Sequence, residues 1–309
     1  MDNKITKKRL SDMFAYEWII IAAVILAAIF LLEFIYSTFS VKLTTGQQFR
    51  IFYDINVSDK NGDDLESLLI NKNTFSFDVL DVDSEKADDT GNVLSARNTL
   101  GMGDVIVTDA AKKNERASSR AEVIYNAFKM YSVDKLLSDA ENYLKSLKST
   151  ESGGATYAEL DEELIAQGFN DRLGGDNRFR TEEEKASGIE QEKQRIKKLT
   201  ETYADLKTLS EIDNQRKLSG EERIFYSVQV ENVGEVRCGI NAESLTGGKT
   251  PASKFFFIDG DRISAKNVVI MFFDRYEDTS DYKGKGALQF ETISFISTVV
   301  RECSALLAE

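Results

Sequence analysis

The chain has 309 residues and a formal net charge of −13, and 42% of its residues are hydrophobic. This length supports one large or two modest domains with buried cores, and the acidic balance argues against nucleic-acid binding, which needs clustered cations. The absence of histidine excludes Ser-His-Asp and Cys-His nucleophiles and every histidine-containing metal site. Cys238 and Cys303 are too few for a thiolate metal site, and their spacing leaves open whether they form a disulfide. We therefore expect no metal and no cofactor.

The first predicted element is an apolar helix at residues 18–39, WIIIAAVILAAIFLLEFIYSTF. A membrane-spanning helix needs about 20 residues, and this run provides them if Glu33 lies near one membrane surface. Basic residues precede the run, and Trp18 and Tyr36 stand at its edges, which favours a cytoplasmic N-terminus. The run is longer than a secretory signal and has no small-residue cleavage site. We predict a basic cytoplasmic segment (1–17), a single-pass helix in the cell membrane, in contact with its lipid bilayer, and an extracytoplasmic remainder.

The extracytoplasmic part begins with a short polar tether (40–48), which leads to the first part of an α/β body (49–110). Runs rich in β-branched and aromatic residues alternate here with polar turns, which is typical of strands. Strand, helix and strand within residues 49–83 favour a parallel unit, because parallel neighbours need a crossover connection. The predicted elements are strands at 49–57, 75–83 and 101–109 and a helix at 64–71 with Asp63 as its N-cap.

A helical insertion is predicted at residues 111–215. Apolar residues recur every three or four positions over 115–148 and 181–213, and a short helical segment lies near 156–167. The apolar positions of the long helix form a narrow seam, of the kind that pairs with one neighbouring helix. Two arrangements stay open: an antiparallel helical hairpin packed on the body, and a coiled coil between chains. The seam residues are Ile189, Ile196, Leu199, Tyr203 and Leu206.

The second part of the α/β body occupies residues 216–309 and returns to strand patterns. Alternating residues on both sides of a tight turn predict a hairpin, and an amphipathic pattern closes the chain. The predicted elements are a hairpin of strands 222–231 and 234–240, a second strand pair at 254–258 and 268–273, and a C-terminal helix at 287–307.

Several short motifs resemble known functional motifs but lack residues or a structural setting that those motifs require. Gly248, Lys249 and Thr250 match the tail of a P-loop, but Glu243 stands where the first glycine is required. The calcium-like run 54–66 lacks the glycine that such a loop needs. The S-x-x-K match at 132–135 lies within a predicted polar helix, and such matches are frequent by chance. The sequence therefore indicates no catalysis, and we predict that the protein is not an enzyme.

Polar residues at two predicted strand ends are the best candidate ligand-binding residues. In open α/β sheets, ligands bind outside the carboxyl ends of strands. Asp54 stands at the end of the first predicted strand, and Thr108 and Asp109 stand at the end of the third. Their hydroxyl and carboxylate groups could hydrogen-bond a small polar solute. A Thr-Asp turn or a helix cap explains the same residues without a ligand.

The layout resembles the type 2 solute-binding proteins of transport systems. The resemblance lies in the opening strand FRIFYDINV, the second strand FSFDVLDVD, the run GMGDVIVTD and the closing helix ETISFISTVV. In that family, a run like GMGDVIVTD forms a strand before the chain crosses to a second lobe. The chain is also similar to membrane proteins of Gram-positive bacteria that are tethered by one N-terminal helix. The resemblance implies an extracytoplasmic module that binds a small solute.

The predicted fold is thus an α/β body with a mixed sheet and a long helical-hairpin insertion, preceded by one transmembrane helix. Two functions of different classes fit it. One is a membrane-anchored ligand-binding or accessory receptor protein, which predicts a concave pocket near Asp54 and Asp109. The other is a structural protein whose helical hairpin docks a membrane-protein partner in a cell-envelope complex. That reading predicts an exposed apolar stripe along 189–206.

Overall fold

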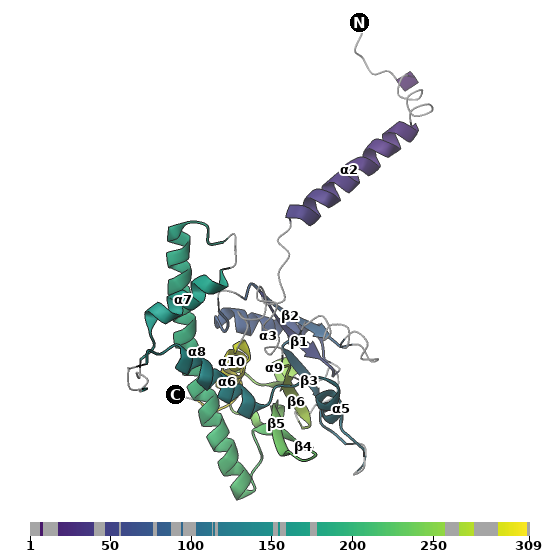
Figure 1. Cartoon of the computed structure of the whole chain (residues 1–309). Coiled ribbons are helices and arrows are strands. Elements are labelled where there is room, and N and C mark those ends of the chain that lie inside the picture. The colour runs from purple at the N-terminus through teal and green to yellow at the C-terminus, as the bar shows by residue number, and fades with distance from the viewer. Residues whose placement is uncertain are drawn as a thin grey trace. The chain divides into compact units, whose positions relative to one another are not determined.

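The computed structural model divides the chain into two compact units, Met1–Leu43 and Thr44–Glu309. Figure 1 shows its elements in chain order. The structure describes residues 7–8, 18–39, 47–55, 57–76, 79–87, 94, 103–112, 114, 117–150, 154, 159–173, 178–256, 266–274 and 290–307. The predicted segments 1–17 and 40–48 therefore lie almost wholly outside the described residues.

The first unit contains one described long helix, α2 (Trp18–Phe39), of 22 residues. Its described large apolar side chains are exposed, from 52% for Ile29 to 66% for Leu32. Among the residues whose side chains the structure describes, no helix combines the length and the apolarity needed to cross a membrane. The side chains of Ile21 and of residues 35–39 lie outside that part of the description.

The second unit is a mixed α/β fold built on a six-stranded mixed sheet. Strands β1 and β2 run parallel, as do β1 and β3, while β3, β6, β5 and β4 pair antiparallel in that order. The sheet order is β2-β1-β3-β6-β5-β4. The strands are β1 (Gln48–Tyr53), β2 (Asp81–Lys86), β3 (Val105–Asp109), β4 (Phe225–Val230), β5 (Gly234–Asn241) and β6 (Val268–Phe272).

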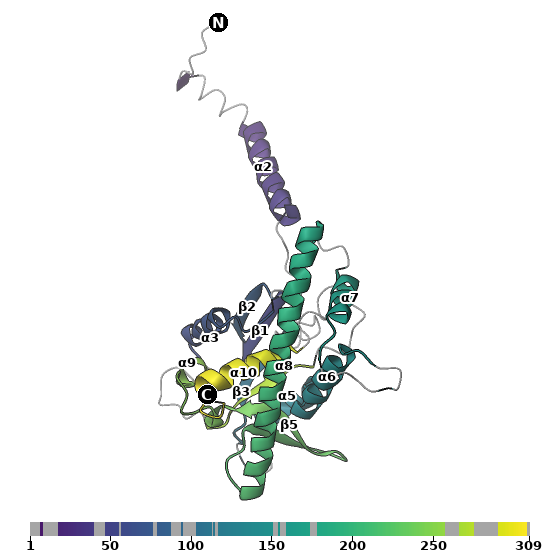
Figure 2. The same cartoon turned by 90° about the vertical axis from the view of Figure 1, so that its left-hand side faces the viewer.

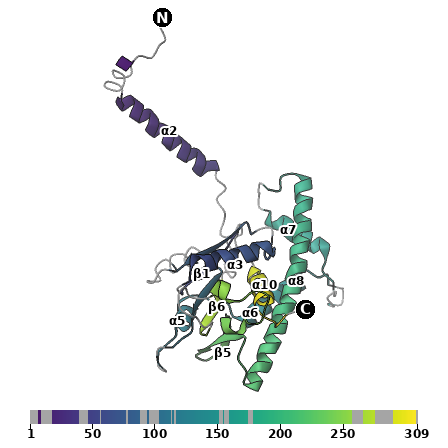
Figure 3. The ribbon, with the colours of Figure 1, turned by 180° about the vertical axis from the view of Figure 1, so that it is seen from behind.

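Helices cover both faces of this sheet. Because successive strand residues point to opposite faces, Val105 and Val107 of β3 face one core cluster and Ile106 faces another. The larger cluster packs beneath α3, α6, α8, α9 and α10, and the smaller one beneath α5. Seen from behind, the strands lie between α5 and α10 (Figure 3). The helices are α3 (Asp59–Asn71), α5 (Arg120–Ala127), α6 (Val133–Ser146), α7 (Glu162–Arg172), α8 (Glu182–Ser219), α9 (Ser253–Phe256) and α10 (Glu291–Cys303), with a 3-10 turn η2 (Ala242–Ser244).

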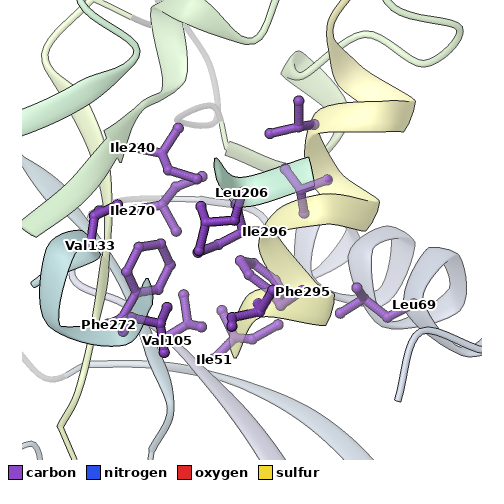
Figure 4. Close-up of a cluster of buried hydrophobic side chains, with 14 of the residues drawn as sticks. Ile51, Leu69, Val105, Val133, Leu206, Ile240, Ile270, Phe272, Phe295 and Ile296 are labelled. Atoms are coloured by element: carbon purple, nitrogen blue, oxygen red, sulfur yellow. The ribbon is translucent and has the colours of Figure 1, made fainter. Parts of the chain in front are cut away.

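The larger cluster joins segments that are far apart in the chain. Ile51 of β1 and Phe272 of β6 meet Phe295 of α10 and Leu206 of α8 in its centre (Figure 4). All four side chains are fully buried. Burying an apolar side chain of this size contributes about 1.5–3 kcal/mol, so this cluster holds the helical layer on the sheet.

Helix α8 has 38 residues and begins and ends at strong capping signals. Thr181 and Glu184 form the predicted capping box, in which the Thr181 hydroxyl accepts from the Glu184 amide at 3.1 Å. Gly220 ends the helix in the left-handed conformation, with φ 73°. Helices α6, α7 and α10 all contact α8, and Figure 2 shows α8 running past α10 and α6.

The predicted seam of α8 is mostly covered by the chain's own helices. Ile196, Leu199 and Leu206 are 3% exposed or less, and Ile189 and Tyr203 are half-buried. Four helices, α5 to α8, precede β4 where the sequence predicted a helical insertion. The described part of α8 therefore presents no exposed apolar stripe along 189–206 of the kind that a docking partner would need.

Several predicted elements are wrong in detail. The predicted helix 115–148 is two helices, α5 and α6, because Met130 between them forms an antiparallel bridge to Phe273. The predicted strand 254–258 is the short helix α9 over its described residues, and β6 pairs instead with β3 and β5. Helix α3 begins after Ser58, whose amide donates to Asn61 Oδ1 at 3.1 Å, so Asp63 is not its N-cap. The predicted hairpin of β4 and β5 is confirmed.

The two cysteines lie in different core clusters. Cys238 of β5 faces the cluster beneath α5, and Cys303 at the end of α10 belongs to the larger cluster. Both are buried and carry free thiols, so the disulfide that the sequence left open does not form. Burial raises the pKa of each thiol to about 12.

Candidate functional site

The predicted strand-end residues lie at a topological switch point of the sheet. β1 leads toward α3 on one face, and β3 leads toward α5 on the other. Ligands of open α/β sheets bind in such crevices. At this point the Thr108 hydroxyl donates to Asp54 Oδ2 at 2.9 Å. The structure thus brings Asp54 and Thr108 together, at the ends of adjacent parallel strands.

Arg120 joins this pair and occupies the carboxylate. Its Nε donates to Asp54 Oδ2 at 2.7 Å and its Nη2 to Asp54 Oδ1 at 2.8 Å, while the Asp54 side chain is 7% exposed. Asp109 lies outside the cluster and is exposed, and its Oδ1 accepts from the Ala111 amide at 2.7 Å. A bidentate arginine satisfies both oxygens of a carboxylate. The cluster therefore ties β1 to the first residue of α5 and leaves no Asp54 oxygen unbound.

A hollow of about 540 Å³ lies beside α5 and β4. Lys112, Glu122 and Tyr226 are among its lining residues. Lys112 Nζ lies 2.6 Å from Glu122 Oε1, and the Tyr226 hydroxyl lies 3.3 Å from Ser119 Oγ. Lys112, Glu122 and Tyr226 thus already have partners within the protein.

The strongest candidate site is a cavity of about 240 Å³ between α8, the first turn of α10 and the segment after α3. We call it the Glu291 cavity. Its walls combine charged, amide and apolar side chains, which is typical of small-ligand sites. Its lining residues are Asn73, Phe75, Ser76, Gln191, Gln194, Arg195, Lys198, Leu199, Phe290, Glu291 and Ser294.

Glu291 carries the unusual chemistry of this cavity. It is the first residue of α10 and is 3% exposed. The Ser76 amide donates to its Oε1 at 3.4 Å, whereas its Oε2 is buried without a hydrogen-bond partner. Burial raises the pKa of Glu291 to about 7, against the opposing effects of Arg195, Lys198 and the neighbouring hydroxyl and amide of Ser76. The Ser76 hydroxyl, which lines the same cavity, is also buried without a hydrogen-bond partner. Buried polar atoms are nearly always hydrogen-bonded, so these two oxygens mark a place where polar groups of a ligand can bind.

The backbone before Glu291 is strained. Phe290 has φ 74° and ψ 0°, a left-handed conformation that is an outlier for a bulky residue. Its buried ring, 5.3 Å from the ring of Tyr143, holds it in place. Such conformations persist only where the surrounding packing over-determines them, and they cluster at functional sites.

Arg195 forms a satisfied ion pair at the wall of the cavity. Its Nε donates to Glu192 Oε2 and its Nη2 to Glu192 Oε1, both at 2.8 Å, and Nη2 also donates to the Tyr143 hydroxyl at 2.9 Å. Both side chains are 5% exposed or less. The pair is therefore close to neutral as a unit, and it fixes the position of α8 next to α6.

Lys198 is the other cation of the cavity. Its Nζ donates to the backbone carbonyls of Asn73 and Thr74. Burial lowers the pKa of Lys198, and Glu291 acts against that effect. Within the described residues, no hydrogen bond or ion pair links Lys198 to Glu291. The cavity therefore holds one acid and one base that do not neutralise each other by contact.

Sequence reasoning missed both Glu291 and Arg120. Ser119 and Glu122 form a capping box that could have placed Arg120 at the start of a helix, but no local signal joins Arg120 to Asp54. Glu291 stood in a predicted amphipathic helix, where an acid near the N-terminus is ordinary. Among the described residues, no group of three acidic or thiol side chains could hold a metal ion.

No protein-family model, curated protein or solved structure shows a significant match to this chain.

Proposed function

We propose that this chain is a membrane-anchored, extracytoplasmic protein that binds a small polar solute in the Glu291 cavity. The observation that carries the proposal is Glu291 Oε2, a buried acceptor without a partner in a cavity large enough for a small molecule. Leaving a buried acceptor unsatisfied costs about 1–3 kcal/mol. A bound ligand that donates to this oxygen removes that penalty, which is a physical reason for the protein to keep the residue.

The proposed anchor is α2. Its 22 residues extend about 33 Å at 1.5 Å per residue, which is comparable with the roughly 30 Å of a bilayer core. Its described apolar side chains are exposed, and exposed apolar surface of this extent is stable in lipid. Lys7 and Lys8 before it favour a cytoplasmic N-terminus. The body, including the sheet and the helical insertion, then lies outside the cytoplasm.

Membrane extraction tests the anchor. The full chain is expected to stay with membranes in alkaline carbonate, whereas Leu26→Arg, which places a charge within α2, is expected to release a large fraction. Protease added to intact cells that express the chain, after removal of any cell wall, is expected to remove the body and leave α2. Release of the unaltered chain by carbonate, or protection of the body from protease, would refute this part of the proposal.

Ligand-induced stabilisation tests the binding function. The full chain in detergent is heated with a panel of sugars, amino acids, peptides and metal ions. A ligand at 100 times its Kd adds about 2.7 kcal/mol to the native state, which is readily seen as a rise in Tm. The same ligand is expected to have little effect on Glu291→Gln and its full effect on Glu201→Gln, an exposed position of α8. An equal rise in all three proteins would place the site elsewhere.

The covered seam of α8 bears on the alternative of a docking protein. Ile196 and Leu206 are buried against other parts of the same chain, so the apolar surface that would hold a partner is already used. The seam of α8 therefore does not favour that alternative over solute binding.

A further inference from the structure

We propose that the solute is a zwitterionic α-amino acid with a short apolar side chain, whose ammonium group binds Glu291 and whose carboxylate binds Lys198. This inference rests on the proposed function, because it names the ligand class of the Glu291 cavity. It follows from the charges of the lining residues, the hydrogen-bonding capacity that remains in them, and the size and apolar surface of the cavity.

The charges of the cavity favour a ligand with both signs. Glu192 and Arg195 neutralise each other at 2.8 Å. The remaining charged groups in the lining are one carboxyl, Glu291, and one ammonium, Lys198, and no hydrogen bond or ion pair among the described residues joins them. A ligand with only a cation would meet the unpaired charge of Lys198, and a ligand with only an anion would meet Glu291. A zwitterion brings a positive charge to Glu291 and a negative charge to Lys198, and it adds no net charge to a buried site.

The remaining hydrogen-bonding capacity assigns the two ends of the ligand. In the ionised form of Glu291, Oε2 is an acceptor without a partner, so it requires a donor, and an ammonium group provides three. Lys198 uses two donors on the carbonyls of Asn73 and Thr74, which leaves one of its three for an acceptor. A ligand carboxylate supplies that acceptor. The two carbonyls also fix the lysine head group, so little side-chain freedom is lost on binding.

The size and the apolar walls limit the rest of the ligand. About 240 Å³ is below the roughly 300–1,000 Å³ of pockets for drug-sized molecules, which disfavours peptides and oligosaccharides. Phe75, Leu199 and Phe290 contribute apolar surface to the lining. The Phe75 ring is stacked on Phe49 at 4.3 Å, so this wall is fixed by the core. A short apolar side chain fits these walls.

Isothermal titration of the full chain in detergent with three matched probes tests the ligand class. The probes are alanine, propionate, which lacks the ammonium group, and ethylamine, which lacks the carboxylate. Alanine is expected to bind at least tenfold more tightly than either, because each charge-assisted hydrogen bond contributes about tenfold or more. Glu291→Gln and Lys198→Gln are each expected to weaken alanine binding by about the same factor. Lys197→Gln, an exposed neighbour on α8, is expected to leave it unchanged.

The possible outcomes distinguish a failure of the zwitterion proposal from a failure of the proposed solute-binding function. Equal binding of ethylamine or propionate, with loss in Glu291→Gln, overturns the zwitterion and leaves solute binding in the cavity intact. Binding of alanine that neither Glu291→Gln nor Lys198→Gln alters overturns the assigned contacts. No binding by any probe, together with no stabilisation by the broader panel, overturns both. Circular dichroism spectra of each variant that match the unaltered chain exclude misfolding as the cause of a loss.

Discussion

The substitution Glu291→Gln tests the reasoning about the cavity most directly, because glutamine has the shape of a protonated glutamate. In the folded protein, burial raises the pKa of Glu291 from 4.5 to about 7. Between these values the native state binds a proton that the unfolded chain has released. Stability therefore falls as pH rises through this window. Below about pH 4.5 both states are protonated, and the carboxyl group adds no pH dependence.

The size of this effect follows from the shift. Each pKa unit corresponds to 1.36 kcal/mol, so the change from 4.5 to about 7 amounts to about 3 kcal/mol. Glutamine at this position cannot ionise. We therefore expect Glu291→Gln and the unaltered chain to be similarly stable at pH 4.5. The variant is expected to be more stable by about 3 kcal/mol at pH 8, in the absence of ligand.

Urea unfolding of the compact unit, residues 44–309, followed by circular dichroism at pH steps from 4.5 to 8, measures this difference. Comparison with Glu201→Gln, an exposed carboxyl on α8, removes contributions shared by the rest of the protein. A difference between Glu291→Gln and the unaltered chain that stays constant across the pH range would refute the reasoning. It would mean that Lys198 and Arg195 keep Glu291 ionised at every pH tested, and that burial does not disfavour its ionised form.

Three further predictions concern the body. Asp213 is fully buried, and its Oδ1 accepts from the backbone amides of Ile224 at 2.8 Å and Phe225 at 3.1 Å. Asp213→Ala leaves these two buried amides without an acceptor, while Arg223 keeps its ion pair with Glu235, so the free energy of unfolding is expected to fall by about 1–3 kcal/mol in urea titration. An unchanged free energy of unfolding would show that these hydrogen bonds are dispensable. Gly248→Ala would place a Cβ 2.4 Å from the carbonyl carbon of Cys303, so the free energy of unfolding is expected to fall by about 1–3 kcal/mol and Tm to fall with it. An unchanged Tm would contradict this close packing. Cys238 and Cys303 are buried and free, so a thiol reagent should label neither in the folded protein and both in urea; labelling of the native protein would show that one is accessible.

The elements that the sequence predicted well are those with local signals. The periodicity of α8, its capping box at Thr181 and Glu184, and the hairpin of β4 and β5 all depend on residues a few positions apart. The helix at α2 follows from the long apolar run that begins at Trp18. Such signals act through backbone geometry and solvent, so they can be read without the rest of the chain.

Where local patterns are ambiguous, tertiary packing decided the outcome. The apolar run after Pro251 fits a short strand equally well, yet Phe255 and Phe256 form the helix α9. The sequence predicted that residues 254–258 would pair with β6. In the structure β6 pairs with β3 and β5, which lie on its two sides in the sheet. A run of a few apolar residues is too short for its periodicity to distinguish a helix from a strand. Whether a sheet edge is available for pairing therefore determines which structure forms.

The candidate site depends most strongly on contacts between distant parts of the chain. Asp54 stands at a strand end as predicted, but Arg120, 66 residues later, binds both of its oxygens. Glu291 lines a cavity with Lys198 only because α10 packs across α8. Helix periods, caps and turns are determined by the sequence itself, since their contacts span a few residues. Which carboxylate is paired and which is buried without a partner depends on contacts between distant segments, and only the folded structure sets those.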